Sequence, residues 1–285
     1  RFRDPNGREW RPHFRATLAH NTVAWNGRDR PGYASPAEEP SSVRLIDATA
    51  DEDVFRLVGR AEWSVGSSTG PTLVHERTIV GLMPDLLVVV DRLEAPSPAT
   101  WIASFHLGEG VRAGVSGRVV DLRSDSGSAR AMAFEIAGEG DLDLAVEDDW
   151  VSPTYNERRR ALAVRARIRG AERTSLVTAL TLGPRTSGDV ASVSSPSVEI
   201  RRAEISGSPV VDLQIGEPEN LLRAIVNPRG AKLRFGGVDS RALVCARRTQ
   251  AGGDTFTAVE DRGEPGSAPR GPGSSGPSIV RMRLR

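Results

Sequence analysis

The sequence predicts an all-β fold, a large antiparallel β-super-sandwich. Short runs rich in Val, Ile, Leu and Thr recur roughly every ten residues and are bounded by Gly, Pro, Ser, Asp and Asn. Long windows lack the repeat of about 3.6 residues that marks an amphipathic helix. The chain has 285 residues, 38% of them hydrophobic and 26% charged, so it is long enough for a sizeable core.

The predicted elements follow in chain order. Residues 14–25 read as a strand that leads into the turn pair Asn26-Gly27, a strong hairpin signal, and residues 31–42 read as a mobile loop. Gly81 and Pro84 place a turn inside a hairpin that covers residues 72–93. The remaining predicted strands are 100–108, 117–124, 129–137, 141–147, 161–170, 174–183, 197–205, 209–216 and 220–228.

The domain organisation is simple. Residues 1–260 are predicted to form one β unit. Residues 261–278 are rich in Gly, Pro and Ser and are expected to be flexible, and residues 279–285 read as a terminal strand.

Charge and composition exclude several classes of function. The formal net charge is +1, so no overall field favours nucleic acid or an anionic membrane, and no apolar run has the length of about 20 residues that a spanning helix needs. Lys232 is the single lysine, and the many guanidinium groups suit carboxylate and sulfate ligands. The single Cys245 excludes an internal disulfide, and a buried, inert thiol is expected there.

The four histidines, at positions 13, 20, 75 and 106, are the candidate functional side chains. Side chains alternate along a strand, so if Val23 and Trp25 face the core then His20 faces a groove. There an imidazole can transfer a proton or bind a metal. For His13 and His106, a partly buried structural ring is an equally good interpretation.

Four blocks carry a resemblance to a known family: FRATLAHNTVAWNGRD (14–29), HERTIVGLMPDLLVVVDRL (75–93), WIASFHLGEGV (101–111) and WVSPTYNERRRALAVRARIRG (150–170). In this order they resemble the carboxyl-terminal β-sheet domain of the heparinase II/III-like polysaccharide lyases. The first block resembles that family's Arg-Ser-Thr-x-x-His-Asn-Thr pattern. The resemblance covers about residues 8–183.

This resemblance implies a polysaccharide lyase that cleaves uronate-containing glycans, heparin- or heparan-like glycosaminoglycans or alginate, by β-elimination. It implies an upstream α/α toroid domain that is apparently missing from this chain, an anionic polysaccharide as partner, and a periplasmic or secreted location. It also implies roles for individual residues. His20 would be catalytic, Arg15, Asn21 and Tyr155 would bind substrate, and His75 with Asp29 would hold one divalent metal ion, zinc or calcium.

Two other readings stay open. The chain is alternatively a non-catalytic carbohydrate-binding or architectural β-sandwich, in which Trp25, Trp63 and Trp101 would form stacking platforms or, more often, core. A hydrolase of another class is disfavoured because the sequence lacks a Gly-x-Ser-x-Gly elbow, a P-loop and paired Cys motifs.

Overall fold

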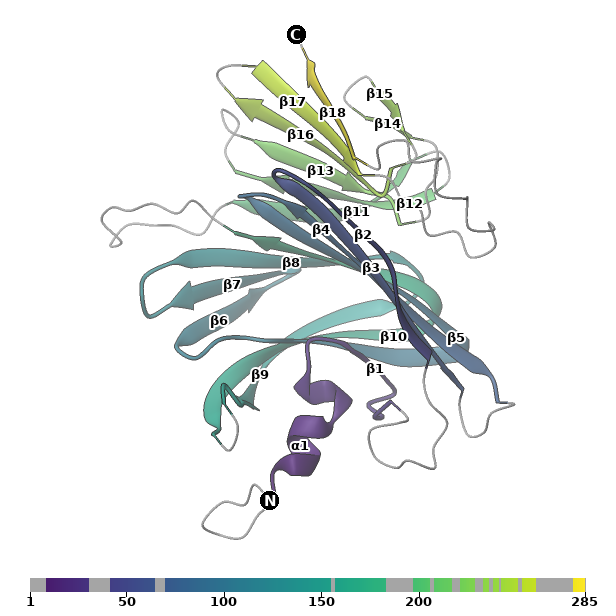
Figure 1. Cartoon of the computed structure of the whole chain (residues 1–285), viewed down its shortest axis with the longest axis vertical. Helices are drawn as coiled ribbons and strands as arrows, with labels where there is room; N and C mark the ends of the chain where they lie inside the picture. Colours follow the sequence, from purple (N-terminus) through teal and green to yellow (C-terminus); the bar gives the residue numbers. More distant parts are fainter. Residues whose placement is uncertain are drawn as a thin grey trace.

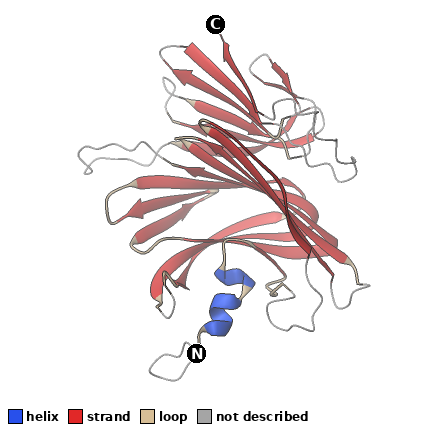
Figure 2. Ribbon diagram, viewed as in Figure 1, coloured by secondary structure: helices blue, strands red, loops and turns tan. Residues whose placement is uncertain are grey.

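The computed structural model describes twelve stretches of the chain: residues 9–30, 42–64, 70–154, 157–182, 197–205, 208–216, 221–228, 233–235, 238–240, 242–250, 253–259 and 279–284. Strands dominate them, as Figure 2 shows, and all the pairings between strands are antiparallel. The prediction of an all-β antiparallel fold is confirmed. The predicted loop at 31–42 and the flexible segment at 261–278 lie outside the described residues, apart from Ser42 at the start of β2.

The larger sheet has ten strands, and its main path runs β2-β3-β4-β5-β10-β8-β7-β6 (Figure 1). Strand β1 pairs with β5, and β9 pairs with β10. The bounds are β1 Val23–Trp25, β2 Ser42–Asp51, β3 Val54–Ser64, β4 Thr72–Leu82, β5 Leu86–His106, β6 Val111–Ser116, β7 Val119–Ser124, β8 Ala129–Gly138, β9 Asp141–Val151 and β10 Arg159–Thr181.

The smaller sheet has six strands in the order β11-β12-β13-β16-β17-β18, and β14 and β15 form a separate pair. The bounds are β11 Val198–Ile205, β12 Ser208–Ile215, β13 Leu222–Val226, β14 Leu233–Phe235, β15 Val238–Ser240, β16 Val244–Gln250, β17 Gly253–Val259 and β18 Ile279–Leu284. Strand β18 lies where the terminal strand is predicted, at the edge of this sheet beside β17.

Two hydrophobic cores hold the sheets. The first lies between them, where Val88 and Val177 of the larger sheet pack with Leu213 and Val244 of the smaller one. The second is enclosed by the larger sheet alone, which curls over itself around residues such as Trp101 (Figure 1). Burial of apolar side chains on both faces stabilises the curled sheet.

Strands β5 and β10 each join two runs that the sequence separates. Leu93 and Trp101 of β5 belong to the second core, whereas Val88 lies in the first. The pairing of β5 with β10 shifts register around Ala171, next to Gly170 with φ +75°. Such a bulge bends a strand. Each of these strands serves both cores because its side chains alternate between two faces: the neighbours Leu176 and Val177 of β10 belong to the second and the first core.

The predicted strand at 14–25 is wrong over most of its length. Residues Arg11–Arg15 form helix α1, Thr17–Ala19 form a 3₁₀ turn, η1, and only β1 is extended. Proline is favoured in a first helical turn, where Pro12 lies. Trp10 is buried and packs against the Phe14 ring, so this spacing is helical.

The turn after β1 is confirmed. Asn26 and Gly27 have φ +48° and +68°, and Trp25 bridges to Arg28, as in a type I′ hairpin turn. The hairpin over residues 72–93 is also confirmed by the pairing of β4 with β5. Gly81, however, lies inside β4, where a Cβ would meet the Phe55 ring, rather than in the turn. The structure adds strands that lie outside the predicted ranges: β2, β3, β6, β14, β15, β16 and β17.

Candidate functional site

The segment Thr17–Thr22 connects α1 to β1 and carries His20. Strand β1 pairs with β5, so the segment lies against one end of the larger sheet (Figure 1). His20 is exposed, and its ring makes no hydrogen bond to a described residue. Its backbone is fixed on both sides, because His20 N–H donates to Thr17 O at 3.2 Å and Thr22 N–H donates to His20 O at 2.8 Å. The result is an accessible imidazole on an ordered backbone.

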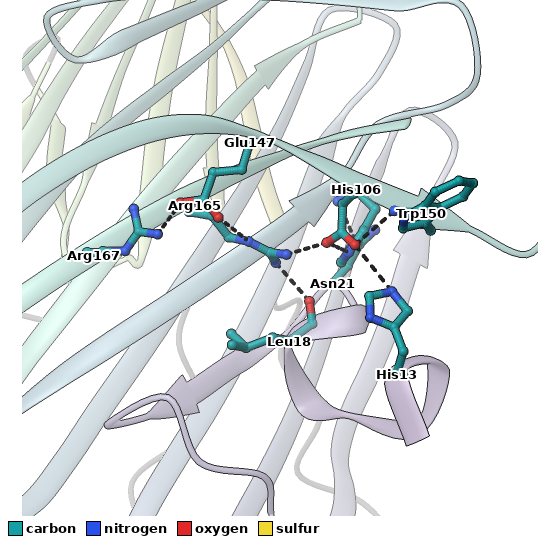
Figure 3. A network of polar contacts seen from close by, with 9 residues as sticks. His13, Leu18, Asn21, His106, Glu147, Trp150, Arg165 and Arg167 are labelled. Atoms are coloured by element: carbon teal, nitrogen blue, oxygen red, sulfur yellow. Dashed lines mark hydrogen bonds and ion pairs between the residues drawn. The ribbon is translucent and has the colours of Figure 1, made fainter. Parts of the chain in front are cut away.

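Between this segment and the larger sheet lies a polar network that includes His13, His106 and Arg165 (Figure 3). All three contact Asp149 of β9, which is buried. Its carboxylate contacts the Arg165 guanidinium and lies 3.0 Å from His106 Nε2 and 3.3 Å from His13 Nε2. The backbone N–H of Trp150 also donates to Asp149 Oδ1, at 2.8 Å. Charge-assisted contacts from several elements therefore hold one carboxylate in place.

Two arms of this network reach the His20 segment. Arg165 Nη1 donates to the Leu18 carbonyl at 2.8 Å. The His106 backbone N–H donates to Asn21 Oδ1 at 2.7 Å, and the His106 ring Nδ1 lies 3.2 Å from the same oxygen. These contacts lie before and after His20 in the chain and so fix the loop against the larger sheet (Figure 3).

The pKa of His106 lies below its ordinary value, because burial outweighs the opposing effect of Asp149. Burial lowers the pKa of His106, Asp149 raises this pKa, and the positive charge of Arg165 and the neighbouring His20 lower it. Both ring nitrogens face acceptor oxygens, Asn21 Oδ1 and Asp149 Oδ2, so the imidazolium form satisfies both contacts and the neutral form only one.

A second network begins at Asp91, which is fully buried in β5. The Arg77 guanidinium binds both of its oxygens, with Nε 2.6 Å from Oδ1 and Nη2 3.0 Å from Oδ2. His75 Nε2 lies 2.6 Å from Asp91 Oδ1, and the Arg30 guanidinium contacts His75 Nδ1. Burial raises the pKa of Asp91, but Arg77 and His75 outweigh it and hold that pKa far below its ordinary value. Burial lowers the pKa of His75.

This second network also contacts the His20 segment. Arg77 Nη1 donates to the Asn21 carbonyl, and Arg30 Nη2 donates to Thr22 Oγ1 at 3.2 Å. Asn21 is therefore held by its side-chain oxygen from one network and by its backbone oxygen from the other. His20 and Asn21 lie on a loop and not on the predicted strand, and their proposed roles stay predictions.

The other predicted site residues are spread more widely. Arg15 ends α1 and is exposed. Asp29 follows the turn, and its Oδ1 accepts the Thr17 N–H at 2.6 Å, which ties the turn to the His20 segment. Tyr155 lies outside the described residues. Substrate binding by Arg15, Asn21 and Tyr155 stays a prediction.

The side chains present do not fit a metal site built from His75 and Asp29. Both nitrogens of His75 are engaged, Nδ1 by a guanidinium and Nε2 by Asp91, so neither lone pair faces open space. Asp29 is engaged by a backbone N–H. In the stretches that the structure describes, no group of three or more His, Cys, Asp or Glu is arranged to hold a metal ion. Metal binding stays a prediction, and His75 here belongs to an arginine-held ion-pair network.

The sequence reasoning missed the buried residues that fix the site. Asp149, Arg165, Arg77 and Asp91 each lie in an alternating strand pattern, where a charged residue reads as a solvent-facing position. One signal was present: Asp91 ends the apolar run LLVVV, where a carboxylate needs a buried partner.

The fold and the site define a class of protein: a curled antiparallel sheet packed on a second sheet, with one accessible histidine on a loop anchored at the end of the larger sheet. The model of the family "Heparinase II/III-like, C-terminal" matches residues 3–193, and the chain belongs to this family. The resemblance stated from the sequence is confirmed.

Solved structures share the fold at low sequence identity. The chain is similar to the heparan sulfate lyase HepC from Pedobacter heparinus, with a TM-score of 0.55 and 15% identity, covering 74% of this chain and 31% of that one. It is also similar to heparinase III, the BT4657 gene product, with a TM-score of 0.52 and 13% identity, covering 79% of this chain and 30% of that one. The chain thus spans less than a third of the length of these proteins. No curated protein matches it. Of the helices described, none has the length and apolar character to cross a membrane.

Proposed function

We propose that this chain is the β-sheet domain of a polysaccharide lyase that cleaves uronate-containing glycans by β-elimination, with His20 as its functional histidine. The observation that carries the proposal is the accessible imidazole of His20, held on an ordered loop by two buried networks. Membership in the heparinase II/III-like family supports it.

The chemistry explains why such a group is needed. The proton next to a uronate carboxylate is removed at neutral pH only if the carboxylate charge is neutralised and the enolate-like intermediate is stabilised by aimed donors. A base then takes the proton, and an acid assists the leaving sugar oxygen. An exposed imidazole can give or take a proton near neutral pH, or donate to the uronate carboxylate as a cation.

The substrate and the partner domain belong to the same proposal. HepC is a heparan sulfate lyase, which favours a heparin- or heparan-like glycosaminoglycan over alginate. The proteins of the matched structures are about three times as long as the region that this chain matches. Their remaining length is enough for a further domain, and we propose that an α/α toroid domain completes the site. A periplasmic or secreted location follows from the same family membership.

The burial of Trp63 and Trp101, two of the three candidate platforms, disfavours a purely sugar-binding module; Trp25 is half-buried. Trp101 and Trp63 are 0% and 7% exposed, and the Arg30 guanidinium covers the Trp63 ring at 4.8 Å. Aromatic platforms that stack on sugars must present an open face. These rings serve the second core instead.

The test is His20→Ala in the full-length lyase, assayed by ultraviolet absorbance of the unsaturated uronate released from heparan sulfate and, separately, from alginate. We expect loss of product with an unchanged melting temperature, because the ring of His20 is exposed and contributes little to packing. Arg112→Ala, an exposed residue of β6, is the control and should retain activity. Full activity of His20→Ala would remove this residue from the mechanism.

A further inference from the structure

The buried carboxylate of Asp149 has no role in the proposed chemistry, yet it lies at the centre of the contacts beneath His20. Its side chain is 7% exposed, so it does not reach substrate. A buried carboxylate is costly unless it is paired, and here Arg165, His106 and His13 surround it. These three partners come from β10, β5 and α1, so Asp149 joins elements that are distant in the sequence.

Two of these partners contact the loop on either side of His20 through their side chains. Arg165 binds the carbonyl of Leu18, two residues before His20, and the His106 ring Nδ1 lies 3.2 Å from Oδ1 of Asn21, the residue after it. Both partners are oriented by the same carboxylate (Figure 3). A loop held at two points flanking one residue leaves that residue little freedom to shift.

We propose that Asp149 is a positioning residue of the lyase site, which fixes the place of the His20 imidazole through Arg165 and His106. This inference rests on the proposed function for its catalytic consequence, but the anchoring itself is independent of activity. Neutralising Asp149 loosens both contacts together, so residues 18–21 are held less firmly while the sheet and the contacts of Arg77 and Arg30 with Asn21 and Thr22 stay intact.

The catalytic consequence is a loss in the chemical step. A reacting group displaced by about 1 Å costs on the order of 10²-fold in rate. Since Asp149 does not contact substrate, the loss falls on kcat and leaves KM nearly unchanged. A residue needed only for global folding would lower the amount of active enzyme and the melting temperature instead.

The experiment compares Asp149→Asn with Asp143→Asn in the full-length lyase. Asp143 lies on the same strand and also pairs with an arginine of β10, Arg169, but this pair is exposed and does not contact the His20 loop. We expect Asp149→Asn to lower kcat about 10²-fold with KM within roughly twofold, and Asp143→Asn to behave as wild type. Equal effects of the two variants, or a loss confined to KM, would overturn the proposal.

Hydrogen–deuterium exchange of the same proteins measures directly how firmly the His20 loop is held. The amides of His20 and Thr22 should exchange faster in Asp149→Asn and at the wild-type rate in Asp143→Asn. Unchanged exchange in Asp149→Asn refutes the positioning role whatever the activity. Faster exchange together with a fully active His20→Ala supports the anchoring and refutes the proposed function of His20 instead. If Asp149→Asn fails to fold, His106→Gln removes the imidazole that joins Asp149 to Asn21, keeps Asp149 paired with Arg165 and leaves the backbone N–H bond to Asn21 in place, and the same exchange result is required.

Discussion

Replacing Arg77 by Leu is expected to destabilise the protein strongly, because it leaves the Asp91 carboxylate buried without its main counter-charge. Asp91 is 0% exposed and Arg77 is 18% exposed, and the guanidinium binds both carboxylate oxygens. Breaking a buried pair on one side costs about 3–5 kcal/mol. Because His75 still donates to Asp91, we expect a cost at the lower end of this range, about 3 kcal/mol. At roughly 2 °C per kcal/mol for a chain of this size, the melting temperature should fall by about 6 °C.

The pH dependence of this loss is a sharper test. Burial lowers the pKa of His75, and the charge of Arg77 contributes to that lowering. Removing Arg77 therefore raises the pKa of His75, and at mildly acidic pH the imidazolium replaces the lost cation beside Asp91. The destabilisation by Arg77→Leu should be smaller at pH about 5.5 than at pH about 8, on either side of the ordinary histidine pKa.

The assay is urea denaturation at both pH values, with Arg169→Leu as the matched control. Arg169 and Asp143 form a cross-strand pair at 3.4 Å in which both side chains are half exposed, so its loss should cost about 0–1 kcal/mol. The reasoning is refuted if Arg77→Leu costs no more than Arg169→Leu, or if its cost is larger at the acidic pH.

Two further predictions concern titration and metals. Burial lowers the pKa of both His75 and His106, so the unfolded chain binds more protons than the folded one as pH falls below about 6.5. The free energy of unfolding should therefore decrease below this pH. In urea titrations, His75→Gln should show a weaker dependence of the free energy of unfolding on pH. Because both His75 nitrogens are engaged by protein groups, treatment with a chelator should leave the melting temperature unchanged. A fall in melting temperature that zinc or calcium reverses would instead establish the metal site predicted from the resemblance.

Local signals sufficed for several elements. The Asn26-Gly27 pair demands positive φ at two successive residues, and the hairpin of β4 and β5 follows from two apolar runs around a turn. The segment before β1 defeated the same reasoning. Pro12 and the spacing of Trp10 and Phe14 indicate a helix. The predicted strand begins at residue 14, so Trp10 and Pro12 are not considered with it.

The sequence by itself determined the all-β class and the family, and its resemblance to that family nominated His20 and Asn21 as site residues, since spacing, turn residues and short motifs are properties of neighbouring positions. Only the tertiary structure decided what holds His20 in place. The two faces of β5 and β10 line the two cores, and the curled sheet places Asp149 and His106 next to Asn21. Contacts between residues so far apart in the chain leave no trace in local periodicity, because side-chain alternation indicates which face a residue occupies and not which distant charge it meets there.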